Sequence, residues 1–367
     1  MPRSHWTALR TVLLVATLLA GLVAVRWLVT GGLNRPMAPP APPRPAPVRI
    51  AHAPPGTRLS LGGRQPIVVD PATGSIARIA PGSGDVTELF RQGGSTVLVA
   101  DRRVWAVPAG RVGPPRPLGE AAIALPALAD DRVWLVDARY GASGRQRYVL
   151  VEVGLADGRV HTRWTLPYQT APIAVLPSGL LARGLQDDLE VVEPGSGRVR
   201  AVLARTARFV DARGGRVAWL EGRDLHVRDL ASGAEKVVPP PPGSPDWYTQ
   251  GGGLAPWPDC CYGLGAFAPD GRTLAIYARL AEPGAPGLAV VDLDRGRAAL
   301  LAGSEGATPT GCRPCLAWAS NGWLYFFAAG PATTSIGAWR PGDGSAGPLG
   351  LDVDQALESV PSSVAAN

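Results

Sequence analysis

One short pattern returns throughout the body of the chain: an apolar strand that ends near an acidic residue, a tight turn with glycine, and a second strand. Five clear copies occupy residues 68–76, 151–160, 191–199, 227–235 and 290–298, and two weaker copies occupy residues 105–113 and 338–346. Their turn glycines, Gly74, Gly110, Gly158, Gly197, Gly233, Gly296 and Gly344, are separated by 36, 48, 39, 36, 63 and 48 residues, an average of 45. Each copy therefore marks one structural unit of similar size.

A unit of this length matches a blade of four antiparallel strands. Such a sheet cannot bury both faces alone, whereas sheets stacked around an axis bury the faces between neighbours and expose only short edges. In each turn the acidic side chain can accept hydrogen bonds from turn amides, and glycine takes the positive φ. We therefore predict an all-β fold, a β-propeller of seven four-stranded blades over residues 56–355.

Other strands and hairpin turns fall into the same register. Apolar runs occur at 132–138, 216–222, 273–279 and 323–329, and several follow a short turn such as Arg213-Gly214-Gly215. The first blade lacks an innermost strand, so we expect residues 351–360 to supply it and residues 356–367 to form a C-terminal tail. Rings of six or eight blades stay open as alternatives, because the first and last blades are incomplete.

One unit resembles a known repeat. The stretch FAPDGRTLAIYARLAEPGAPGLAVVDLDRGRAALL at 267–301 is similar to a WD40-like repeat of the TolB-type β-propeller family, with an aromatic residue, an Ala-Pro-Asp-Gly turn and a strand. Residues 316–327 form a degenerate second copy, and the other blades keep only the later half. The resemblance implies the propeller fold and a periplasmic or extracellular interaction role. It transfers no partner, because propellers host many unrelated functions.

The N-terminal segment predicts a membrane anchor. Residues 11–25 carry no charge, and extension to Val29 gives a helix of about 28 Å if Arg26 reaches the interface. We predict a cytoplasmic tail at 1–10, a transmembrane signal anchor at 11–29 and a Pro-rich spacer at 30–55. The propeller would then lie outside a cell membrane. A cleaved signal peptide and an anchored propeller inside the cytoplasm are the alternatives, and our preference for export rests on the cysteines.

Four cysteines form two groups, Cys260 with Cys261 and Cys312 with Cys315. When the innermost strands are aligned on Phe267 and Trp318, Cys261 and Cys312 take the same place in adjacent blades. We therefore expect two disulfides between these loops, with the pairing open, as an oxidising compartment favours. The alternatives are a zinc site, free thiols, and a ring formed by the adjacent cysteines that resembles quinoprotein dehydrogenases.

The longest insertion, 239–262, joins one blade to the next, and the sizeable loops all fall at the same end of the predicted ring. Loops on a rigid scaffold are frequent binding sites. We therefore predict a binding face made of Asp246, Trp247, Tyr248, Trp257, Asp259 and Tyr262. Its partner would be another envelope or surface protein, or a cell-wall component. The alternative is that these aromatic rings pack over the channel mouth.

The remaining composition excludes some functions. The formal charge of +6 comes almost entirely from scattered arginines, so we expect no nucleic-acid partner. No nucleophile elbow is present, and His161 and His226 fall on outer strands, so we expect no catalytic residue, metal or cofactor. An oligopeptidase would need a separate hydrolase domain, for which there is no room. We predict a binding module that is not an enzyme; the alternative is a secreted enzyme or ligand sensor with its site at the channel mouth.

Overall fold

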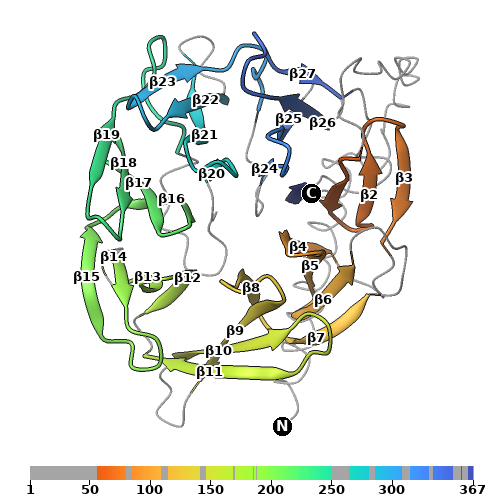
Figure 1. The fold of residues 1–367 in the computed structure, drawn as a ribbon, viewed down its shortest axis with the longest axis vertical. Helices are drawn as coiled ribbons and strands as arrows, with labels where there is room; N and C mark the ends of the chain where they lie inside the picture. Colours follow the sequence, from red (N-terminus) through yellow and green to blue (C-terminus); the bar gives the residue numbers. More distant parts are fainter. Residues whose placement is uncertain are drawn as a thin grey trace, which may run out of the picture. The chain divides into compact units, whose positions relative to one another are not determined.

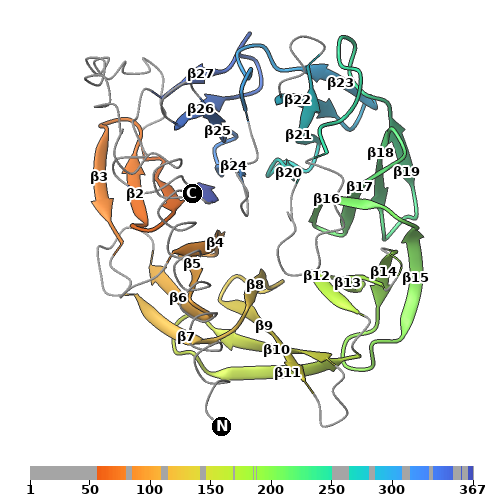
Figure 2. The same ribbon diagram turned by 180° about the vertical axis from the view of Figure 1, so that it is seen from behind.

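The computed structural model describes residues 56–79, 85–108, 115–140, 146–167, 170–184, 186, 188–249, 264–280, 286–307, 315–329, 334–349, 357 and 363–366. Within them the strands form seven four-stranded antiparallel sheets, the blades of a β-propeller (Figure 1 and, from behind, Figure 2). The predicted all-β propeller of seven four-stranded blades is therefore confirmed. The predicted tail, anchor and spacer lie outside the described residues, and among the residues described no helix is long and apolar enough to cross a membrane.

Every blade contains four strands, and these are ordered from an innermost strand at the channel to an outermost strand at the rim. Blades 1 and 2 consist of β28 (Ser363–Ala366), β1 (Leu59–Gly62), β2 (Ile67–Asp70) and β3 (Ser75–Arg78), and of β4 (Val86–Gln92), β5 (Ser95–Ala100), β6 (Arg103–Pro108) and β7 (Arg116–Glu120). Blades 3 and 4 consist of β8 (Ile123–Pro126), β9 (Arg132–Tyr140), β10 (Gln146–Gly154) and β11 (Val160–Leu166), and of β12 (Ala171–Leu176), β13 (Gly179–Arg183), β14 (Leu189–Val192) and β15 (Val199–Ala204). Blades 5 and 6 consist of β16 (Arg208–Arg213), β17 (Arg216–Glu221), β18 (Asp224–Asp229) and β19 (Glu235–Val238), and of β20 (Gly265–Phe267), β21 (Thr273–Arg279), β22 (Pro286–Asp292) and β23 (Arg297–Leu300). Blade 7 consists of β24 (Leu316–Trp318), β25 (Leu324–Ala329), β26 (Thr334–Trp339) and β27 (Gly347–Pro348).

The ring is closed by a strand from the far end of the chain. β28 pairs with β1, with Leu59 opposite Ala366 and Gly62 opposite Ser363. Each innermost strand also contacts the innermost strands of both neighbouring blades, and β28 contacts β24 and β4. Closure by a C-terminal strand is thus as expected, but its predicted place at 351–360 is wrong. Residues 363–366 belong to the ring rather than to a tail.

The core lies between neighbouring blades. Along β17, Val217 and Trp219 pack with residues of blade 4, whereas Ala218 and Leu220 pack with residues of blade 6. Successive side chains of a strand point to opposite faces, and here both faces are covered. This explains why the second strands of the blades appear in the sequence as continuous apolar runs.

The repeated turns behave as predicted in most blades. The carboxylates of Asp70, Asp229 and Asp292 each accept hydrogen bonds from two turn amides, at 2.9 to 3.3 Å. The matching glycines adopt positive φ in five turns, at Gly74, Gly158, Gly197, Gly233 and Gly296. In blade 7 the residue with positive φ is Gly342 instead of Gly344. Gly110 lies outside the described residues.

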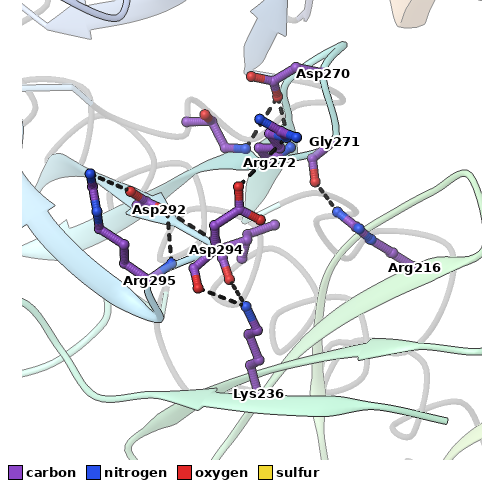
Figure 3. Close-up of polar contacts among 10 residues, drawn as sticks. Arg216, Lys236, Asp270, Gly271, Arg272, Asp292, Asp294 and Arg295 are labelled. Atoms are coloured by element: carbon purple, nitrogen blue, oxygen red, sulfur yellow. Dashed lines mark hydrogen bonds and ion pairs between the residues drawn. The ribbon is translucent and has the colours of Figure 1, made fainter. Parts of the chain in front are cut away.

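Polar contacts at the turns also join blade 5 to blade 6 (Figure 3). The guanidinium of Arg216 donates to the carbonyl of Gly271. Lys236, the only lysine in the sequence, donates from Nζ to the carbonyls of Leu293 and, at 3.1 Å, Asp294. Long basic side chains of one blade therefore satisfy turn carbonyls of the next.

Candidate functional site

The central channel of the ring contains a cavity of about 600 Å³. All seven innermost strands line it, so every blade contributes to one site. Gly93, Pro269 and Ser320 extend the lining into the turns that follow β4, β20 and β24. The cavity therefore reaches the end of the channel at which these innermost strands lead into their hairpin turns.

Two carboxylates reach this channel from irregular strands. β4 carries a register shift between Val86 and Glu88, and β16 carries one between Phe209 and Asp211. The carboxylate of Glu88 accepts a hydrogen bond from the Ala124 amide at 2.8 Å, and that of Asp211 accepts one from the Phe267 amide at 2.7 Å. β-Bulges re-aim side chains in this way. Each carboxylate thus satisfies an amide of the next blade's innermost strand.

Asp211 has an unusual protonation equilibrium. Burial of its carboxyl group raises its pKa to about 6. The amides of Phe267 and Ala212, at 2.7 and 2.8 Å, and the nearby Arg213 charge favour the carboxylate, but desolvation outweighs them. A carboxyl group with this pKa changes its charge near neutral pH, so the net charge of the cavity depends on pH in this range.

Two arginines line the same cavity, Arg91 on β4 and Arg213 at the end of β16. Arg91 is half-buried and donates from Nη1 to the Thr96 hydroxyl at 2.8 Å. Arg213 is more exposed and donates from Nη1 to the Phe267 carbonyl at 3.3 Å. The described lining therefore carries two basic and two acidic side chains.

Aromatic rings form much of the remaining wall. Phe90, Phe209, Phe267 and Trp318 line the cavity, one each from β4, β16, β20 and β24. The indole of Trp318 donates to the Ala266 carbonyl at 2.9 Å, which fixes its orientation. Such a wall can hold an apolar group, while the charged residues orient a polar one.

Sequence reasoning did not find these residues, although a signal exists. β4 ends as Glu88-Leu-Phe-Arg91-Gln before Gly93-Gly94, and β16 ends as Asp211-Ala-Arg213 before Gly214-Gly215. Both innermost strands thus place an acidic residue, then an arginine, then two glycines in the turn. We interpreted the second glycine pair only as a hairpin turn.

One residue of the predicted binding face, Trp247, lies differently from our expectation. Trp247 is only 1% exposed and packs in the core between blades 5 and 6, so its ring is not an accessible anchor. Its backbone bridges to Ala278, and the Tyr248 amide donates to the Tyr277 carbonyl at 3.0 Å. Tyr248 is partly buried, and Asp246 is half-exposed. Trp257, Asp259 and Tyr262 lie outside the described residues.

The other predicted groups have mixed outcomes. Cys315 is 2% exposed and lies at the start of β24, whereas Cys260, Cys261 and Cys312 lie outside the described residues, so the disulfides stay a prediction. His226 lies on β18, where its ring stacks on Trp219 and its Nδ1 is 2.8 Å from Glu235. No set of three or more metal-ligating side chains occurs within the described part of the chain.

No family model and no curated protein matches the chain, but solved structures match its fold. An acylaminoacyl peptidase in complex with Z-Gly-Gly-Phe-chloromethyl ketone matches at TM-score 0.55 and 10% identity, over 83% of this chain and 52% of that one. A puromycin-hydrolysing peptidase of Mycobacterium tuberculosis matches at 0.53 and 16%, over 83% and 55%. TolB from Acinetobacter baumannii matches at 0.47 and 9%, over 84% and 66%.

These matches correct one prediction. The chain spans about half the length of either peptidase. The prediction that the chain is not an enzyme is corrected by this finding: the fold is shared with peptidases, so it does not exclude an enzyme. At 10% and 16% identity, the likeness establishes the fold.

Proposed function

We propose that this chain is a membrane-anchored, extracytoplasmic binding module whose ligand occupies the central channel. The observation that carries the proposal is the cavity of about 600 Å³, to which all seven blades contribute. Ligand sites are typically concave, largely apolar and about 300–1,000 Å³ in volume, with a few polar groups that fix orientation. The aromatic wall with Glu88, Arg91, Asp211 and Arg213 has this composition.

The remaining parts of the proposal come from the sequence. The apolar segment 11–29 supports single-pass anchoring, and the Pro-rich segment 30–55 supports a spacer that holds the ring away from the bilayer. The partner would be an envelope or surface protein, or a cell-wall component, that presents a small group or a chain segment to the channel.

Obstruction of the channel tests the proposal. Ser320 and Pro126 are exposed residues of the lining. Ser320→Trp therefore narrows the cavity without touching the core, and Pro126→Trp narrows it from the end of β8. Ser178→Trp is the matched control, because Ser178 is exposed in the equivalent turn of blade 4 and is not part of the lining. Full-length protein would be purified from its native membrane and examined by native mass spectrometry.

We expect a bound species on the wild type and on Ser178→Trp, and loss of that species from both channel variants at unchanged melting temperature. A species that stays equally abundant on all four proteins, or a wild type that carries none, would place function elsewhere than in the channel.

A further inference from the structure

The guanidinium of Arg91 is held in a fixed position on the channel wall. Its Nη1 donates to Thr96 Oγ1 at 2.8 Å, and Thr96 Oγ1 lies 3.1 Å from Ser60 Oγ. Both hydroxyl residues are only 3% exposed, so water does not compete for these contacts. Ser60 belongs to β1 of blade 1 and Thr96 to β5 of blade 2. The hydroxyl pair therefore orients Arg91 across a blade interface.

Arg91 has no acidic partner among the described residues. Arginines elsewhere do pair, as Arg102 with Asp137, Arg132 with Glu152 at 3.1 Å and Arg200 with Glu193 at 2.9 Å. Burial lowers the pKa of Arg91, which means that the cation is poorly solvated where it lies. A desolvated cation that faces a cavity without a counter-charge is an incomplete ion pair.

The acidic groups of the cavity do not complete it. The Glu88 carboxylate accepts from the Ala124 amide, and the Asp211 carboxylate accepts from the amides of Phe267 and Ala212. These three hydrogen bonds come from main-chain amides and not from Arg91. Arg213 lies in the same lining and adds a second positive charge.

We propose that the channel binds its ligand through an anionic group, a carboxylate or a phosphate, held by the guanidinium of Arg91. The planar guanidinium matches the oxygens of either group, and Nη1 is already oriented by Thr96. The aromatic wall would receive the apolar part of the same ligand. This inference rests on the proposed function, because it names the ligand class of the channel site.

The probes are benzoate and phenyl phosphate, with neutral benzamide as the control ligand. All three share a ring that suits the aromatic wall, and they differ in charge. Binding to the full chain would be measured by ligand-observed nuclear magnetic resonance titration at constant ionic strength. We expect at least one anionic probe to bind about tenfold more tightly than benzamide.

Arg91→Gln should lower the affinity for that anionic probe about tenfold and leave benzamide unchanged. Arg103→Gln, at an exposed position of β6, removes the same charge outside the cavity, and its affinity for the anionic probe should stay close to that of the wild type. The affinity of Arg91→Lys for the anionic probe should lie between those of the wild type and Arg91→Gln. Thr96→Val should lower this affinity without removing a charge. Melting curves of each variant confirm that it folds.

Equal binding of benzamide and both anions, or unchanged anion binding in Arg91→Gln, would overturn the inference. If the native bound species disappears in Ser320→Trp but persists in Arg91→Gln, the anion site is wrong and the channel function stands. If the species persists in Ser320→Trp, the channel function itself fails.

Discussion

At the scale of single residues, the raised pKa of Asp211 has a consequence for stability. Its pKa rises from 3.8 to about 6, so the folded state binds the proton more tightly than the unfolded chain does. The tighter proton binding stabilises the folded state. This stabilisation is complete below about pH 4 and is lost as the pH rises through about 6. We expect its loss to lower the free energy of unfolding by up to about 3 kcal/mol over that range.

Urea denaturation of the wild type and Asp211→Asn at several pH values between 4 and 8 measures this effect. Asp211→Asn should lack the decline, whereas Asp85→Asn, on the exposed residue before β4, should retain it. If the free energy of unfolding of Asp211→Asn falls with pH as steeply as that of the wild type, another group is responsible for the effect.

The same titration bears on the anion site. Among the described lining residues the ionisable ones are Glu88, Arg91, Asp211 and Arg213. Protonation of Asp211 removes a negative charge, so benzoate should bind more tightly as the pH falls through about 6. Asp211→Asn should make this affinity independent of pH between 5 and 7. Persistent pH dependence in that variant would show that Asp211 is not the group responsible.

Gly93 is a second residue with a specific prediction. It has φ of +52°, and a Cβ there would lie 2.3 Å from the Asp130 carbonyl oxygen of the neighbouring blade. Gly93→Ala should therefore reduce the free energy of unfolding by at least about 2 kcal/mol. Gly94→Ala is the matched control, because nothing lies within 4 Å of its Cβ position. Equal urea midpoints for the two variants would contradict the assigned contact.

At the scale of elements, the first part of the long insertion is a structural segment. Trp247 packs between two blades beside β21, so Trp247→Ala should cost about 3–5 kcal/mol of stability. Thermal and urea denaturation would measure the loss, with Tyr248→Ala, at a partly buried ring, expected to cost less. If Trp247→Ala is as stable as the wild type, the core packing assigned to Trp247 is contradicted and its ring is again a candidate surface anchor.

The cysteine loops provide a further element-scale prediction. We expect no alkylation of the four cysteines before reduction, and a lower melting temperature after reduction, since each disulfide typically contributes about 2–4 kcal/mol. Alkylation followed by intact mass measurement tests this directly. Four alkylated thiols in the unreduced protein would exclude the disulfides and remove the argument for an oxidising compartment.

These elements also show what sequence reasoning could reach. The Asp-turn-Gly repeats were found because a blade is local, so its turns and strands lie within about 45 consecutive residues. Trp247 was misplaced because a loop sequence does not reveal which strand edge it will follow. Glu88 and Asp211 were missed because bulges, which turn them into the channel, leave no periodic signal. The cavity was not predicted because its lining combines residues from every blade, which are far apart in the sequence.

At the scale of the whole molecule, closure of the ring rests on β28. Val364 is fully buried and lines the cavity, and its strand completes blade 1. Val364→Asp should therefore destabilise the entire ring, because it places an unpaired charge in the core and weakens the pairing with β1. We expect a lower melting temperature and faster proteolysis. A local effect confined to blade 1, seen as unchanged hydrogen exchange in the other blades, would mean that the ring is stable while open.

The fourth strand of the first blade, β28, follows the strands of all the other blades in the chain, so the first blade is completed only after the other six have been synthesised. Until then the nascent chain carries an unpaired edge on β1 that other strands could occupy. A nascent chain that stalls before residue 363 should therefore be cleared by proteases, although its other six blades have been made.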